Sequence, residues 1–265
     1  MIAIVLIKQV PETPNQIEWD PATQTLDIDK STKVLNPYDQ FAVEEAIKMR
    51  EQDGGKVYVL ALGPARTTEV IRECLAMGAD EGVLLDDAAF QGGCGRSTAR
   101  ALVAAIKKIG EFDVILAGKR AIDSETAQIA PRIAAMLGVP VVSLVTRVES
   151  WDFAGKKVVL ERALDTGKER VEARLPLVLT AEKDMNKPRY PSLISIRKAS
   201  KKPISQWTPA DLGLEPEAIG MAGSSLRVGA IETPPPRESG QIWDGDTDQA
   251  VDELVARLLE TKVIG

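Results

Sequence analysis

Hydrophobic residues form short, nearly continuous runs in the first half of the chain, and an amphipathic stretch follows each run. The runs are rich in β-branched residues, which is typical of strands buried on both faces of a parallel sheet. They lie at 2–10, 56–62, 82–85 and 112–118. Apolar positions at helical spacing lie between and after them, at 36–55, 66–78, 96–110 and 125–138.

Regular alternation of strands and helices predicts right-handed crossovers and a parallel sheet. The expected fold class is therefore α/β, with a doubly wound, mostly parallel sheet and helices on both faces, in the Rossmann-like manner. From residue 139 the pattern changes to short β-rich runs separated by Gly, Asp and Pro, at 139–150, 156–164, 168–175 and 177–182. These runs predict hairpin strands that form an antiparallel extension of the sheet.

Proline and polar residues dominate the segments 188–193, 201–207 and 232–246, which predicts an extended arm rather than a second core. The main domain is expected to span 1–200 and the arm 201–265. The arm ends in an amphipathic helix whose apolar stripe comprises Val251, Leu254, Val255, Leu258 and Leu259. Such a stripe is expected to be buried against another surface, and the pattern leaves open whether that surface belongs to the parent domain or to another polypeptide.

Charge and composition narrow the function. The chain has 33 basic and 39 acidic residues, a net charge of −6 that disfavours nucleic-acid binding. No apolar stretch is long enough to insert in a membrane, and the first residues lack the features of a secretory leader, so we expect a cytoplasmic protein. Cys74 and Cys94 form no C-x-x-C pair, so no metal site is expected. Histidine is absent, which favours a binder or carrier over a catalyst.

Loops at the carboxyl ends of parallel strands are the expected ligand site. Four segments arrive there, at 8–13, 62–67, 92–98 and 118–128. In the last one, Gly118 permits close backbone approach, and Ser124, Glu125 and Thr126 are expected to open a helix whose free N–H groups favour a phosphate.

Spacing alone favours simple helix capping for that last segment, because Asp123 and Glu125 repel an anion unless they face ribose hydroxyls. Pro131 indicates that the helix either starts late or is distorted early. A P-loop is excluded, since Arg96 stands where the Walker lysine belongs and Phe90 where its first glycine belongs. No G-x-G-x-x-G follows the first strand, which disfavours an ordinary dinucleotide-binding dehydrogenase.

A basic loop over 182–202 carries Met185 among charged residues. A flexible apolar side chain on a basic loop suits docking to an acidic partner, with Met185 as the anchor. The alternative is a solvated loop with an incidentally exposed methionine.

Five segments in the same order, at 5–13, 35–46, 62–80, 118–128 and 175–204, resemble the β subunit of electron-transfer flavoproteins over almost the whole chain. The resemblance implies a heterodimer with an α subunit that holds a redox-active FAD. The dimer accepts electrons from dehydrogenases such as acyl-CoA dehydrogenases and passes them to a quinone-linked or other acceptor. The β chain is then an electron carrier rather than a catalyst on its own, and its C-terminal arm packs on the α subunit.

The resemblance also implies site residues. Partner docking is assigned to Met185, Lys187, Arg189 and Tyr190. The implied nucleotide-binding residues are Leu6, Asn36, Pro37, Tyr38, Asp39, Leu62, Gly118, Lys119, Arg120, Ala121, Ile122, Asp123, Thr126, Ala127 and Gln128.

Two branches of this family remain open for the nucleotide. The loop at 186–193 is similar to the branch whose β subunit holds a structural AMP, which is the favoured expectation. The 123–131 stretch is similar to the electron-bifurcating branch, in which the β subunit holds a second FAD that oxidises NADH, with Arg120 near the flavin. Cys94 and Gly95 depart from that branch's usual Asp-Thr pair. A function of another class is a non-redox adenine-nucleotide sensor, which would need neither the long arm nor the basic loop.

Overall fold

The computed structural model describes residues 1–12, 18–20, 25–27, 31–227, 229, 235, 239–240, 242–243 and 245–264. By its internal contacts the chain divides into two units, Met1–Gly229 and Ala230–Gly265. This division lies beyond the 200/201 position expected from the sequence, because residues 204–207 join the main sheet as a strand. Residue 13 of the first expected site loop and most of the expected extended segment 232–246 lie outside the described residues.

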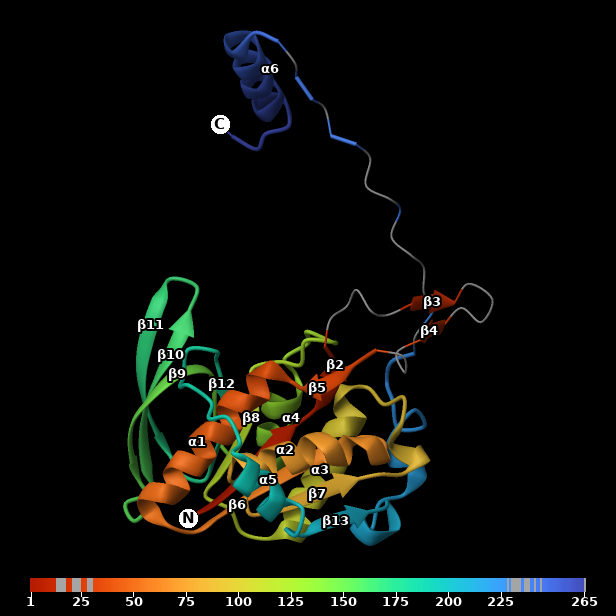
Figure 1. The fold of residues 1–265 in the computed structure, drawn as a ribbon, viewed down its shortest axis with the longest axis vertical. Coiled ribbons are helices and arrows are strands. Elements are labelled where there is room, and N and C mark those ends of the chain that lie inside the picture. Colours follow the sequence, from red (N-terminus) through yellow and green to blue (C-terminus); the bar gives the residue numbers. More distant parts are fainter. Residues whose placement is uncertain are drawn as a thin grey trace. The chain divides into compact units, whose positions relative to one another are not determined.

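A nine-stranded sheet forms the centre of the first unit, in the order β11-β10-β9-β12-β8-β1-β6-β7-β13 (Figure 1). Its strands are β1 Ile2–Ile7, β6 Lys56–Leu62, β7 Glu81–Leu85, β8 Val114–Gly118, β9 Val141–Asp152, β10 Lys157–Leu164, β11 Gly167–Arg174, β12 Leu177–Ala181 and β13 Ile204–Trp207. Two small antiparallel pairs join β2 Gln9–Pro11 to β5 Lys33–Leu35, and β3 Glu18–Asp20 to β4 Thr25–Asp27. Every neighbour in the large sheet is parallel except β9–β10 and β10–β11, which confirms the predicted fold class.

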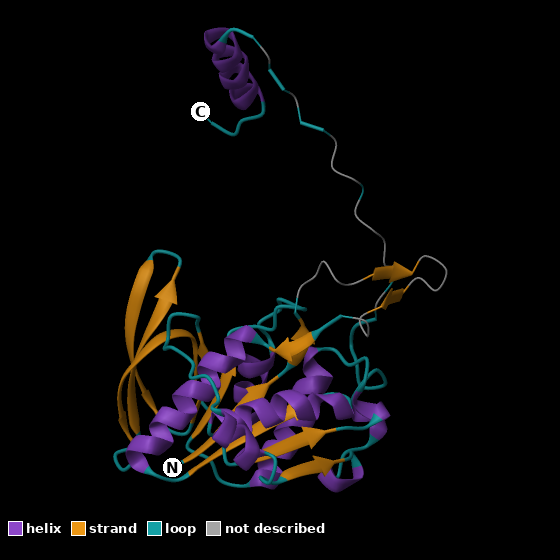
Figure 2. Cartoon of the chain, viewed as in Figure 1, coloured by secondary structure: helices purple, strands orange, loops and turns teal. Residues whose placement is uncertain are grey.

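Helices cover both faces of this sheet (Figure 2). The α-helices are α1 Pro37–Asp53, α2 Thr68–Met77, α3 Gly95–Ile109, α4 Ile129–Leu137, α5 Leu193–Ala199 and α6 Thr247–Glu260. Short 3-10 helices span Ala65–Thr67, Ala88–Phe90, Ala210–Leu212 and Pro216–Ala218. Helix α1 begins with Pro37 at its first position and ends before Gly54, whose φ of 70° terminates it.

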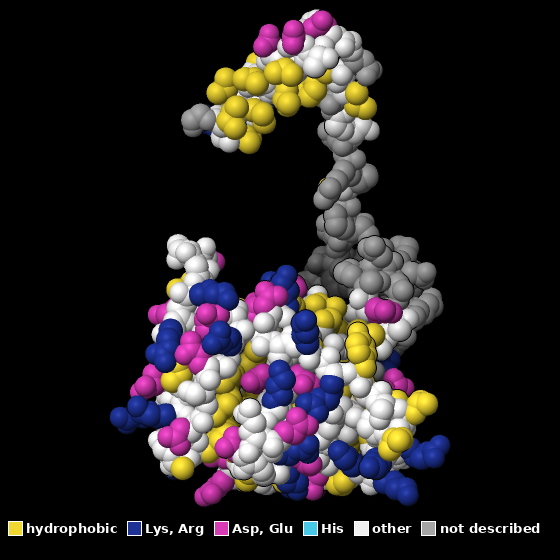
Figure 3. Space-filling model, turned by 60° about the vertical axis from the view of Figure 1, so that its left-hand side comes forward, with side chains coloured by type: hydrophobic (Ala, Val, Ile, Leu, Met, Phe, Trp, Pro, Cys, Tyr) yellow, Lys and Arg dark blue, Asp and Glu magenta, His cyan; other side chains and the backbone are white. Residues whose placement is uncertain are grey.

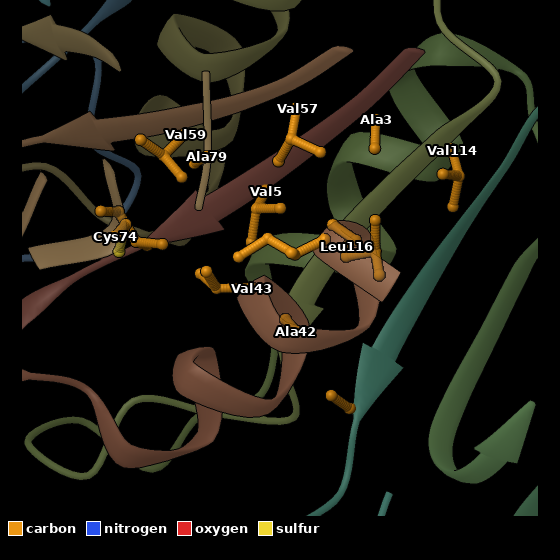
Figure 4. Close-up of a cluster of buried hydrophobic side chains, with 14 of the residues drawn as sticks. Ala3, Val5, Ala42, Val43, Val57, Val59, Cys74, Ala79, Val114 and Leu116 are labelled. Carbon is orange, nitrogen blue, oxygen red and sulfur yellow. The ribbon is translucent and has the colours of Figure 1, made fainter. Parts of the chain in front are cut away.

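Alternate residues of β1 point into two separate apolar cores. Ala3 and Val5 face α1 and α2, together with strand residues such as Val57 (Figure 4). Ile4 and Leu6 belong to the other core, which contains residues of α3 and α4. A strand buried on both faces therefore reads as one continuous apolar run, which is why the β1 sequence lacks polar alternation.

The antiparallel extension comprises β9, β10 and β11. Its outermost strand, β11, is strongly charged and forms cross-strand ion pairs with β10, including Lys157–Glu172 and Arg162–Glu169, both at 2.7 Å. Charge on an edge strand discourages pairing with other chains. The run at 177–182, expected as a further hairpin strand, instead forms β12, which lies parallel between β8 and β9.

The second unit contains α6. Its cap is Asp246, whose carboxylate accepts the N–H groups of Asp248 and Gln249. Apolar side chains gather along one side of this helix (Figure 3), and Val251, Leu254, Val255 and Leu259 are exposed within the chain. Among the described residues, no helix is long and apolar enough to cross a membrane.

Leu116 tests the central packing, because it lies on β8 opposite Val5 of β1 and Leu179 of β12 and is 0% exposed. Leu116→Ala should lower the free energy of unfolding by about 2–5 kcal/mol, through lost burial and a residual cavity. Leu164→Ala, at an exposed end of β10, is the matched control and should change it by less than about 0.5 kcal/mol. Urea denaturation of the full-length chain measures both, and equal effects would contradict this account of the core.

Candidate functional site

The carboxyl ends of β1 and β8 meet the first turn of α1 at Asp39. This buried carboxylate accepts the backbone N–H of Lys8 at 2.8 Å and that of Gly118 at 3.0 Å. It also accepts the side-chain amide of Asn36 at 2.8 Å. Burial raises the pKa of Asp39 to about 7, while these donors and the Lys8 ammonium pull it down. One carboxyl group thus joins three segments that are far apart in the sequence.

Asn36 connects this junction to the loop after β8. Its amide N–H also donates to the carbonyl of Arg120 at 3.0 Å, and its carbonyl accepts the N–H of Ile122 at 3.2 Å. The side chain makes no capping bond to α1, although Asn36 precedes that helix. Apart from its bond to the Asp39 carboxylate, its hydrogen-bonding capacity is directed to the 118–128 loop, which holds Ala121 and its neighbours against the sheet edge.

Gly118 is required where β8 approaches α1. A Cβ atom there would lie 2.6 Å from Tyr38 Cβ and 2.8 Å from the Tyr38 carbonyl carbon, and would also meet the Asp39 carboxylate. Leu6 and Leu62, at the ends of β1 and β6, pack into the core on the α3 and α4 side. Pro37 is exposed at the start of α1. The structure therefore brings together the predicted residues from β1, α1 and β8.

Three cationic side chains surround this junction. Lys8 pairs with Asp123 at 2.6 Å, and Lys119 pairs with Glu182 at 2.7 Å. Lys119 Nζ also lies 4.8 Å from the centre of the Tyr38 ring. Lys8 lies in the predicted site loop 8–13 and Glu182 at the start of the basic loop, but neither was among the predicted nucleotide-binding residues. Each directly follows a strand that ends at this edge, a positional signal that could have found them.

Arg120 is the third cation. It pairs with Glu125 at 2.8 Å and places its guanidinium carbon 5.8 Å from the Tyr38 ring centre. Its Nε atom is buried without an acceptor among the described residues. A buried donor of this kind favours a ligand that supplies the missing acceptor.

Residues 123–128 form an exposed loop, not the first turn of a helix, which corrects the prediction for Ser124, Glu125 and Thr126. Helix α4 begins at Ile129, so that Pro131 occupies its first turn, where a missing N–H is tolerated. Within the described structure, no protein acceptor takes the backbone N–H groups of Thr126, Ala127 and Gln128. Ala127 has a φ of 53° and Gln128 a right-handed conformation, an alternation typical of anion-binding concavities.

The N-terminus of α3 lies beside this concavity. A Cβ atom added to Gly95 would lie 3.1 Å from Gln128 Oε1, and Arg132 holds the same oxygen at 3.0 Å. The segments 92–98 and 118–128, both predicted at the sheet edge, therefore meet at Gln128. Two helix starts facing one concavity can bind the phosphate of a nucleotide.

The two free cysteines lie in opposite environments. Burial raises the pKa of Cys74, whereas hydrogen bonds from Ser224 and from the Ser97 backbone lower the pKa of Cys94 to about 5. In the parts of the chain that the structure describes, no three metal-ligating side chains cluster.

Within the basic loop, the expectation that the Met185 side chain is exposed is wrong. Met185 is only 8% exposed and packs in the core beside α1, whereas Tyr190 is 96% and Leu193 86% exposed. Lys187 is exposed, and Arg189 is occupied by ion pairs to α1. A hollow of about 290 Å³ on the same segment is lined by Leu193, Ile194, Arg197, Lys198 and Lys201.

Asp39 gives a pH-dependent prediction. Between about pH 4 and 7 the folded chain keeps a proton that the unfolded chain loses, so the stabilising contribution of Asp39 falls as pH rises through 7. An amide does not titrate, so the stability of Asp39→Asn relative to wild type should rise across this window by about 1.4 kcal/mol per pH unit. Urea unfolding of both proteins from pH 4.5 to 8 measures the difference, and a constant difference would contradict the raised pKa.

The model of the family described as electron transfer flavoprotein domain matches residues 25–212. The electron transfer flavoprotein subunit beta of Thermoanaerobacterium thermosaccharolyticum is 44% identical, with all of both chains covered. The caffeyl-CoA reductase-Etf complex subunit CarD of Acetobacterium woodii is 40% identical, again over both whole chains. Protein FixA of Azotobacter vinelandii is 34% identical over 97% of this chain and 94% of its own. The chain therefore belongs to the electron transfer flavoprotein family, as a β subunit.

Proposed function

We propose that this chain, with its α subunit, carries electrons from a CoA-ester dehydrogenase to a quinone-linked or other acceptor through the FAD of the α subunit. Family membership establishes electron transfer by a flavin-associated complex with an α subunit. The observation that carries the finer proposal is the junction of Asn36, Asp39 and Gly118, which holds the 118–128 loop at the sheet edge. A structured loop with free N–H groups at that place is suited to a nucleotide.

The nucleotide in the β subunit is proposed to be AMP. The free N–H groups of Thr126, Ala127 and Gln128 would hold its phosphate, and Asp123, which pairs with Lys8, would accept its ribose hydroxyls. Gly118 leaves room for close approach of the backbone. A ligand that binds only the folded chain stabilises the fold by mass action, which is the role proposed here.

A second FAD in this site is the other candidate, and the buried, unpaired Nε of Arg120 favours it. FAD contains the AMP moiety, so the same loop could bind it, and the flavin beyond the phosphates could provide the missing acceptor. A bound FAD supplies hydride chemistry with NADH. Similarity to a subunit of a caffeyl-CoA reductase-Etf complex is compatible with either nucleotide and supports a CoA-ester oxidoreductase as the partner.

The docking surface is proposed to be the segment 190–198, which we call the docking segment. It presents Tyr190, Leu193 and Ile194 to solvent beside the basic residues Arg197 and Lys198. An exposed apolar anchor ringed by cations fits an acidic-rimmed hydrophobic hollow on a dehydrogenase. The anchor proposed from the structure is Leu193 in place of Met185.

The nucleotide proposal is tested by co-expressing the chain with its α subunit and measuring FAD and AMP per heterodimer. One FAD with one AMP supports the simple carrier, and two FAD establish the second candidate. Arg120→Ala should reduce nucleotide retention in the β subunit at least tenfold, because it removes a cation from the loop. Arg162→Ala, which breaks a comparable ion pair on the antiparallel extension, is the control and should change nothing. Absence of flavin from a folded heterodimer would refute both proposals and bring forward the nucleotide sensor.

Docking is tested with Leu193→Glu, which places a negative charge where an acidic partner is expected. From a panel of purified acyl-CoA dehydrogenases, the enzyme that reduces the wild-type heterodimer fastest is chosen. The variant should raise the apparent KM for that enzyme about 30-fold, as expected for an interface anchor worth about 2 kcal/mol. Leu164→Glu on the antiparallel extension should leave KM unchanged. An unchanged KM for Leu193→Glu rules out this docking surface.

A further inference from the structure

The docking segment has almost no core of its own. Leu193, Ile194 and Ile196 are exposed, and within α5 only Ala199 is buried. Hydrophobic packing therefore does little to fix this short helix, and an isolated helix of this length is unstable in water. Polar contacts at its two ends therefore contribute much of what fixes its conformation.

At the N-terminal end, Arg189 attaches the segment to α1. Its guanidinium donates to both oxygens of Glu44, at 2.9 and 3.0 Å, and to both oxygens of Glu51, at 2.6 and 3.0 Å. The Arg189 backbone N–H also donates to Glu44 at 3.1 Å. Glu44 is nearly fully buried and Arg189 is 35% exposed, so this contact is a partly buried, bidentate ion pair rather than a fully solvated surface pair. Tyr190, which follows directly, is 96% exposed.

At the C-terminal end, two further cations attach the segment to α2. Arg72 donates through Nη1 to the carbonyl of Ala199 at 2.7 Å and to that of Lys202 at 2.6 Å. Lys202 reaches in the opposite direction, donating through Nζ to the carbonyl of Leu75 at 3.1 Å and contacting that of Ala79. Carbonyls at the C-termini of both helices are thereby neutralised by positive charge.

We propose that Arg189, Arg72 and Lys202 are positioning residues that hold the docking segment in its binding-competent conformation. This inference rests on the proposed docking function of Leu193. A segment already ordered before encounter loses less conformational entropy on binding, so its partner binds more tightly. Release of either end would leave Leu193 exposed yet incorrectly placed.

The test separates positioning from folding. Arg189→Gln alone leaves Glu44 buried without a partner and is expected to destabilise the chain. The double variant Arg189→Gln/Glu44→Gln removes both charges, so the heterodimer should keep its FAD content and its melting temperature. Its apparent KM for the chosen acyl-CoA dehydrogenase should nevertheless rise at least tenfold with kcat unchanged, and amide hydrogen exchange over 193–200 should accelerate at least tenfold. Arg72→Met should have the same two effects from the other end.

The matched control is Arg162→Gln/Glu169→Gln, a paired loss of charge on the antiparallel extension, which should change neither KM nor exchange at 193–200. When Leu193→Glu is already present, adding Arg189→Gln/Glu44→Gln should not raise the apparent KM any further, because both changes act through the same segment. Wild-type KM and exchange in the double variant would overturn the inference while leaving the docking proposal intact. No effect from Leu193→Glu would remove the docking proposal itself.

Discussion

The Asp39 carboxylate holds the functional edge of this protein together. Three donors converge on it, from Lys8 at the end of β1, Gly118 at the end of β8 and Asn36 before α1. A buried carboxylate is costly unless its oxygens are fully hydrogen-bonded. Here the donors come from the ends of two neighbouring strands and from the residue that precedes α1. The position of the 118–128 loop therefore depends on a polar junction rather than on apolar packing.

Sheet topology explains why this junction lies where it does. The chain leaves β1 towards α1 on one face and leaves β8 towards α4 on the other, and β1 and β8 are neighbours. Adjacent parallel strands whose connections diverge open a crevice at their carboxyl ends. Asn36 and the free N–H groups near Gln128 lie at that crevice. The path of the backbone alone therefore brings the candidate nucleotide-binding residues together.

Most of the fold could be predicted from periodicity, because doubly buried strands and amphipathic helices differ in their apolar spacing. The start of α4 could not, since Ser124 is a good capping residue, and tertiary contacts such as the Asn36 bonds and the Lys8–Asp123 ion pair are not visible in the sequence. Met185 and Leu193 are apolar residues on one basic loop, and sequence alone does not rank their burial. Contacts of this loop with α1, about 140 residues earlier in the chain, determine which of the two side chains is buried.

Helix α1 contacts both the proposed nucleotide loop and the docking segment. Its first turn bears Asp39 at the nucleotide loop, and its later turns bear Glu44 and Glu51, which hold the docking segment. At about 1.5 Å per residue, this helix sets a fixed separation of roughly 18 Å between Asp39 and Glu51. One residue inserted between them would rotate the two ends by about 100° relative to each other. Helix α1 is thus expected to tolerate substitutions far better than insertions or deletions, because its length fixes the distance and the rotation between the nucleotide loop and the docking segment.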